Sequence, residues 1–246
     1  MEIEDTIRTV IGIIGSVTSI HIFLSPASII NEICKWRSTL RYSGFQYHMK
    51  ILICALSVLY GLPFVKPNSI IVSNINGIGL AIHIMYITMF LKFCKDKETR
   101  MINMVVIVLI TLFLAAVALS SLLIFHTDTE RYTIVGAICI FFNVLMCSSS
   151  LNVMRAVIQE KSVIYINPYL SLTVLANGLI WIAYGAIHFD IIIVLPNGLE
   201  AGFAACELFV YAVYYSRTQF PDDDQRAAIE MNNSGAGLKI IKEKLH

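Results

Sequence analysis

The segments YGLPFVKPNSIIVSNING (60–77) and YGAIHFDIIIVLPNG (184–198) follow one pattern, from which the architecture of the chain can be read. Each begins with Tyr-Gly near the end of an apolar run and ends with Asn-Gly inside the next one. Asn76 lies six residues past Ile70, and Asn197 lies six residues past Ile191. At 1.5 Å per residue, both amides are expected about 9 Å along their helices. The recurrence indicates that one structural unit occurs twice.

The rest of the chain is strongly apolar. Of its 246 residues, 57% are hydrophobic and only 14% are charged, and the mean hydropathy is +0.73. Soluble domains carry about 25% charged residues, and a helix needs about 20 apolar residues to cross a bilayer. No strand pattern competes with the apolar runs. The sequence therefore predicts an all-α integral membrane protein with seven transmembrane helices, in the runs 10–30, 46–64, 70–91, 101–125, 132–154, 163–188 and 191–216.

The repeated unit extends to the cytosolic loops. Ser38 precedes Tyr60 by 22 residues, and Ser162 precedes Tyr184 by the same 22 residues. Helices one to three are therefore expected to recur as helices five to seven in the same orientation, which requires an odd linker helix between them. The predicted domains are a first three-helix repeat at 1–95, the linker helix at 96–128, a second three-helix repeat at 129–217, and a polar, disordered tail at 218–246.

The distribution of basic residues predicts the orientation of the chain in the membrane. Fifteen of the 18 lysines and arginines fall on one side of the seven predicted helices, and only Arg8, Lys66 and Arg131 fall on the other. Cytoplasmic loops carry the excess of basic residues. The N-terminus is therefore expected outside or in a lumen, and the C-terminal tail in the cytosol.

The chain resembles the SWEET family of sugar transporters from residue 7 to residue 216. The resemblance rests on the motifs FLSP (23–26), KWRST (35–39), YSGFQYHM (42–49), YGLPF (60–64), NGIG (76–79), EKSV (160–163), LSL (170–172), WIAYG (181–185) and LPNGL (195–199). It implies a plant protein of two parallel repeats that needs no cofactor and moves mono- or disaccharides such as glucose or sucrose. Transport would be passive, bidirectional uniport by alternating access in the plasma or vacuolar membrane, and family members also form homo-oligomers.

The same resemblance implies roles for individual side chains. Asn76 and Asn197 match a family pair that hydrogen-bonds sugar hydroxyls, Trp181 matches an aromatic that stacks on the sugar, and Ser57 matches a pocket position that varies with sugar size. Tyr60 is a candidate for the outer gate. Other interpretations stay open, because a transmembrane asparagine can bond a neighbouring helix and a tryptophan can belong to the interfacial aromatic belt.

The chain departs from the family at the hinge. Family members carry four prolines, one each on helices one, two, five and six, and only Pro26 is present here. The other three positions hold Gln46, Ser150 and Asn167, with Pro168 one place late. A proline removes a backbone hydrogen bond and weakens a helix, so its loss is expected to stiffen the inner half. A transport-impaired or redesigned relative of the family is therefore an alternative.

Other classes of protein were weighed against a uniporter. Ionisable residues inside a membrane are functional candidates, and His83, Glu200 and Glu207 would suit a proton-coupled carrier. Seven helices also describe a receptor, but receptors lack a three-plus-three repeat. An enzyme would require clustered His, Asp or Glu at metal-binding spacing, which the sequence lacks, and the net charge of +1 gives no indication of nucleic acid.

Overall fold

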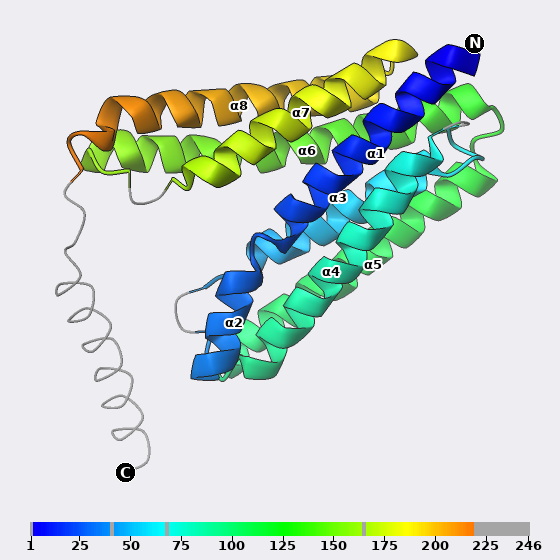
Figure 1. The fold of residues 1–246 in the computed structure, drawn as a ribbon. Coiled ribbons are helices and arrows are strands. Elements are labelled where there is room, and N and C mark those ends of the chain that lie inside the picture. Colours follow the sequence, from blue (N-terminus) through cyan, green and yellow to red (C-terminus); the bar gives the residue numbers. More distant parts are fainter. Residues whose placement is uncertain (1, 40–41, 67–68, 164–165, 219–246) are drawn as a thin grey trace.

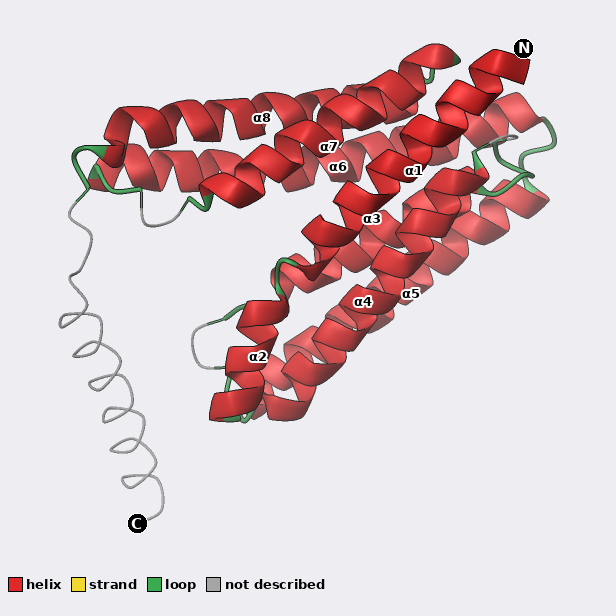
Figure 2. Ribbon diagram, in the orientation of Figure 1, coloured by secondary structure: helices red, strands yellow, loops and turns green. Residues whose placement is uncertain are grey.

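The computed structural model describes residues 2–39, 42–66, 69–163 and 166–218, and within them all regular secondary structure is helical (Figures 1 and 2). The predicted tail lies almost wholly outside the described residues. The helices are α1 (Glu2–Leu24), α2 (Ala27–Trp36), α3 (Phe45–Gly61), α4 (Ile70–Phe93), α5 (Lys97–Leu123), α6 (Asp128–Glu160), α7 (Pro168–Ile187) and α8 (Ile191–Tyr215).

The first crossing consists of two helices, whereas the sequence predicted one helix over 10–30. Helix α1 ends at Leu24 and α2 begins at Ala27, with Pro26 between them. Proline has no backbone N–H and cannot continue the hydrogen-bond ladder of α1. Residues 3–36 still form one apolar stretch that is long enough to span a membrane. The break therefore lies inside a single crossing.

The prediction of seven transmembrane helices is confirmed. Six stretches of the described chain are long and apolar enough to cross a bilayer, and they contain α1 with α2 and each of α4 to α8. Helix α3 has 17 residues and lies between two of these crossings in the chain. Its length of about 26 Å, at 1.5 Å per residue, completes the seventh crossing.

Contacts between helices repeat in the two halves of the molecule. Helix α3 packs on α4 as α7 packs on α8, and α1 packs on α4 as α6 packs on α8. The halves meet through α1 with α7 and through the equivalent pair, α3 with α6. Each contact of one repeat thus has a counterpart in the other, as two parallel repeats require. Helix α5 packs against α3, and most of its surface is exposed, so it is the linker.

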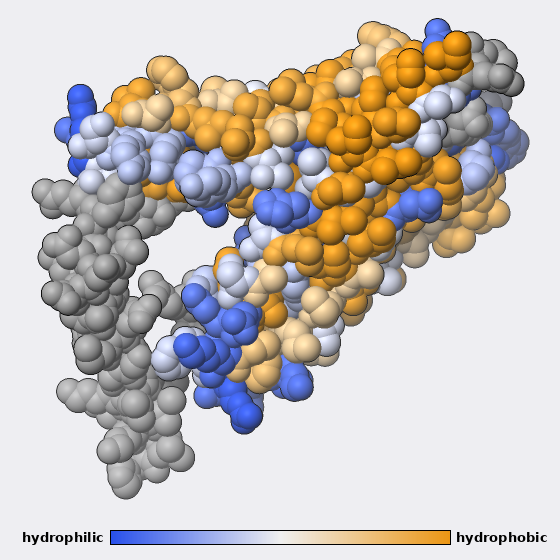
Figure 3. All heavy atoms as spheres, in the orientation of Figure 1, coloured by the Kyte–Doolittle hydropathy of each residue, from blue (hydrophilic) through white to orange (hydrophobic). Residues whose placement is uncertain are grey.

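The molecule has the form of a V (Figure 1). Helices α6, α7 and α8 form one arm, and α2 to α5 form the other. The arms meet near the N-terminus, where the connections from α3 to α4 and from α7 to α8 lie; we call this the closed end. They separate toward α2 and the start of α7, which we call the open end. Figure 3 shows the hollow between the arms and hydrophilic side chains at their tips.

Glycines account for the close approach of some helices. A Cβ atom added to Gly178 of α7 would lie 2.8 Å from the backbone oxygen of Asn197 on α8, and one added to Gly79 would lie 2.7 Å from the ring of Phe23. Gly77 and Gly202 have no neighbouring atom within 4 Å of such a Cβ. Close packing therefore depends on glycines that face another helix, whatever motif contains them.

Candidate functional site

A cavity of about 140 Å³ lies between the two arms and is lined by both repeats. Its walls include all four predicted sugar-binding residues together with Tyr60. They come from four helices: Ser57 and Tyr60 from α3, Asn76 from α4, Trp181 from α7 and Asn197 from α8. Residues 140 positions apart in the sequence are thus brought to one space.

The two asparagines have matching hydrogen bonds. The Nδ2 atom of Asn76 donates to the carbonyl oxygen of Val72 at 2.9 Å, and that of Asn197 donates to the carbonyl oxygen of Ile193 at 2.7 Å. Each amide is thus held by its own helix, one turn back. Among the described residues, neither Oδ1 atom accepts a hydrogen bond. Each side chain keeps one N–H and one oxygen available for a ligand hydroxyl.

Trp181 is anchored by the opposite repeat. Its Nε1 donates to Oγ of Ser19 on α1 at 3.1 Å, and the Ser19 hydroxyl donates to Oδ1 of Asn177 at 2.9 Å. Thr18 donates to the same oxygen at 2.7 Å. The indole is only 6% exposed, so it does not belong to an interfacial belt. Sequence reasoning missed Ser19 and Asn177, although both are polar residues inside apolar runs.

Asp190 holds the closed end together. The Tyr60 hydroxyl donates to its Oδ2 at 2.5 Å, the Tyr132 hydroxyl donates to its Oδ1 at 3.3 Å, and Nζ of Lys66 lies 3.9 Å from Oδ2. Lys66 also lies 4.0 Å from the centre of the Tyr132 ring, as in a cation–π contact. Asp190 is 1% exposed and also caps α8 by accepting from the Ile192 amide. This carboxylate links both repeats.

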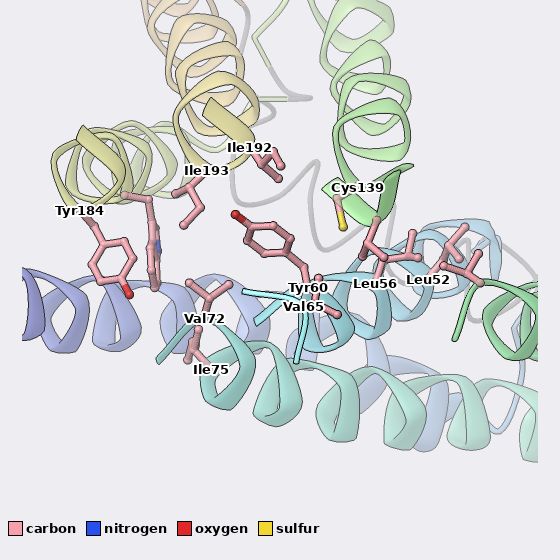
Figure 4. Close-up of a cluster of buried hydrophobic side chains, with 13 residues drawn as sticks. Leu52, Leu56, Tyr60, Val65, Val72, Ile75, Cys139, Tyr184, Ile192 and Ile193 are labelled. Carbon is pink, nitrogen blue, oxygen red and sulfur yellow. The ribbon is translucent and has the colours of Figure 1, made fainter. Parts of the chain in front are cut away.

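Apolar side chains reinforce the same end of the cavity. Figure 4 shows Tyr60 extending from α3 toward Ile192 and Ile193 of α8, within one buried cluster that also contains Trp181 and Tyr184. Burial of a large apolar side chain contributes about 1.5–3 kcal/mol. The closed end therefore combines a polar link with apolar packing, whereas the charged side chains Lys50 and Glu200 line the cavity farther from it.

The family model described as "sugar efflux transporter for intercellular exchange" matches residues 9–98 and 133–219. The chain belongs to this family, the SWEET transporters. Bidirectional sugar transporter SWEET4 of Oryza sativa subsp. indica is 44% identical over 215 residues, covering 87% of this chain and 83% of that protein. Bidirectional sugar transporter SWEET5 of Arabidopsis thaliana is 36% identical over 233 residues, covering 95% and 97%.

A solved structure of a eukaryotic SWEET transporter supports the fold. It matches this chain with a TM-score of 0.84 and 32% sequence identity, covering 87% of this chain and 99% of that one. The two segments matched by the family model fall on the two SWEET repeats and leave most of α5 between them. Family membership makes the chain a sugar transporter rather than an enzyme.

The positions of the SWEET hinge lie toward the open end but differ from one another in their backbone. Pro26 marks the break between α1 and α2, Gln46 is the second residue of α3, and Ser150 lies inside α6. Asn167 caps α7, and its Oδ1 accepts from the backbone amides of Tyr169 at 3.1 Å and Leu170 at 3.3 Å. The described contacts include no hydrogen bond among Gln46, Ser150 and Asn167. Their hinge role stays a prediction.

The position of each residue within its helix decides whether a missing proline affects the stiffness of that helix. The first backbone amides of a helix have no partner within it, so a proline there removes nothing. Gln46 lies in such a first turn, and Asn167 lies just before one. Pro168 starts α7 as its first residue. Only at Ser150 would a family proline remove a hydrogen bond from a helix interior, so stiffening is expected in α6 alone.

Restoring proline is therefore expected to change sugar exchange markedly only at position 150. Ser150→Pro would weaken the middle of α6, where an interior proline costs about 3 kcal/mol, and is expected to raise sugar exchange severalfold. Gln46→Pro should change exchange less than about twofold, because no interior helical bond is lost. Exchange of labelled sugar in proteoliposomes measures both, with Ser150→Ala as the control. Equal responses at positions 46 and 150 would contradict the helix-interior explanation.

Proposed function

We propose that this SWEET chain is a uniporter that moves mono- or disaccharides in either direction by alternating access. The proposal is carried by one observation: the cavity between the repeats contains Asn76 from one repeat and Asn197 from the other, and each has an N–H and an oxygen without a partner among the described residues. Asn76 and Asn197 would bind sugar hydroxyls, Trp181 would stack on the apolar face of the ring, and Ser57 would set its fit. The relatives named bidirectional sugar transporters support this function.

The V shape allows the structure to be assigned to one state of the proposed transport cycle. With the closed end assigned to the outside and the open end to the cytosol, the structure corresponds to an inward-open carrier whose outer gate contains Tyr60. This orientation follows the excess of basic residues near the open end. We further propose the domain boundaries 1–95, 96–128, 129–217 and 218–246, residence in the plasma or vacuolar membrane, and assembly into homo-oligomers.

Proton coupling has less support than uniport. Nδ1 of His83 bonds to the carbonyl oxygen of Gly79 at 2.7 Å, and its ring contacts Phe23 and Tyr86. Glu207 accepts from the Ser171 hydroxyl at 2.9 Å. Within the described residues, no hydrogen bond or ion pair joins His83 to Glu200 or Glu207. The described residues therefore show no contact through which a proton could pass between His83 and either glutamate.

Uptake of labelled glucose and sucrose into proteoliposomes tests the function. A uniporter should fill the vesicles only to the external concentration, should exchange labelled for unlabelled sugar in either direction, and should ignore an imposed pH gradient. Accumulation above the external concentration under a pH gradient would instead indicate proton coupling. Absence of exchange with either sugar, where a rice or Arabidopsis relative exchanges it under the same conditions, would favour the transport-impaired alternative.

A further inference from the structure

Two opposite charges face the cavity from opposite repeats. Lys50 of α3 and Glu200 of α8 both line it, and both are half-buried. Within the described chain, neither side chain makes an ion pair or a hydrogen bond.

The two charges lie at the same depth. Lys50 precedes Tyr60 by ten residues along α3, and Glu200 follows Asp190 by ten residues along α8. Because Tyr60 and Asp190 are hydrogen-bonded, they fix a common level for the two helices, which run in opposite directions. Ten residues at 1.5 Å each place Lys50 and Glu200 about 15 Å from that level, toward the open end.

Unpaired charges at such a depth need an explanation. A lysine or aspartate at the centre of a transmembrane helix costs about 2.5–3.5 kcal/mol on insertion scales, and intramembrane charges generally pair or mark a transport path. A neutral sugar requires neither charge. A lysine and a glutamate on facing helices could, however, pair with each other once the intervening cavity closes.

We propose that Lys50 and Glu200 form an inner latch, which pairs when the open end closes and separates when it opens. The structure shows the opposite state, in which the inner pair is separated and Lys66 and Tyr60 contact Asp190 at the closed end. Helices α3 and α8, with the residues flanking them, supply both latches, so the rocking that separates one pair brings the other together. This inference rests on the proposed alternating-access function.

Charge reversal tests the latch. Lys50→Glu and Glu200→Lys would each place like charges opposite one another, and each is expected to lower sugar exchange by about tenfold or more, since like charges at an interface disfavour its closure. The double variant Lys50→Glu/Glu200→Lys restores opposite charges and should recover exchange to within about threefold of the unsubstituted protein. Lys95→Glu, in the exposed connection before α5, and Glu98→Lys, exposed in the first turn of α5, are matched controls that should leave exchange unchanged.

A labelling experiment without sugar separates a latch from direct sugar binding. In a chain whose six cysteines are replaced, Ser57→Cys provides one cavity thiol for a membrane-impermeant reagent added at the closed end. The single reversals should lower this labelling about tenfold, because the state open at that end needs the inner pair, and the double variant should restore it. Reduced exchange with unchanged labelling would overturn the latch and leave the proposed function standing. Absence of exchange by the unsubstituted protein, together with absence of labelling in the Ser57→Cys chain that keeps Lys50 and Glu200, would overturn the two together.

Discussion

Replacing Asn76 or Asn197 with alanine is expected to lower sugar exchange by about ten- to a hundredfold, and replacing both should abolish it. Each side chain offers a ligand one N–H and one oxygen, because its other N–H is bonded to its own helix. A hydrogen bond contributes about 0.5–1.5 kcal/mol, so two lost bonds reduce binding by about 5- to 160-fold. The losses should be similar for the two positions, because the repeats place them equivalently.

Counterflow of labelled sugar at low concentration is the appropriate measurement, since it reports loss of binding directly. Asn152→Ala is the matched control, because Asn152 is an exposed asparagine of α6 that does not line the cavity. It should exchange sugar like the unsubstituted protein. Full exchange by Asn76→Ala or Asn197→Ala would remove these residues from the sugar site.

Asp190→Ala is expected to open the closed end. The substitution removes the acceptor of Tyr60 and Tyr132, leaves Lys66 without its carboxylate, and removes the cap of α8. Lys66 is only partly buried, so the largest loss is the hydrogen bond from the buried Tyr60 hydroxyl to a charged group, which contributes about 1.5–3 kcal/mol. The equilibrium should therefore shift by about ten- to a hundredfold toward the state that is open at this end.

Asp190→Asn separates the two roles of this residue. Asparagine can still cap α8 and accept from Tyr60, but it carries no charge for Lys66, so a smaller shift is expected. Reaction of the Ser57→Cys thiol with an impermeant reagent at the closed end measures the shift. Asp128→Ala is the control, since the exposed carboxylate of Asp128 lies 3.8 Å from Arg131 and a pair with one exposed partner contributes little. Labelling equal to that control would exclude Asp190 from the gate.

The repeated sequence pattern predicted the positions of the amides well. Helix α3 ends at Gly61, α4 begins at Ile70 and α8 begins at Ile191, as the Tyr-Gly and Asn-Gly spacings required. Local signals set these boundaries: a polar connection and the start of an apolar run. Helix α7 was harder to predict, because the apolar run begins at residue 163 whereas the helix begins at Pro168.

The partners of the predicted residues could not be found in the same way. Tyr60 was predicted as a gate residue, but Asp190 lies 130 positions away and is brought to it only by packing of the repeats. Lys50 was counted among the fifteen basic residues on the cytosolic side, because nothing local indicates that a lysine near the start of α3 faces a cavity. Such pairings depend on tertiary structure, which helix periodicity does not encode.

The bonding of the two amides to their own helices has a thermodynamic consequence for a carrier of this design. When the arms rock, no hydrogen bond between Asn76 and Asn197 must break, so each helix keeps its half of the site in both states. The empty carrier then recovers the same half-sites whichever way it faces. In the uniporter proposed above, the sugar concentrations alone would then set the direction of net flow.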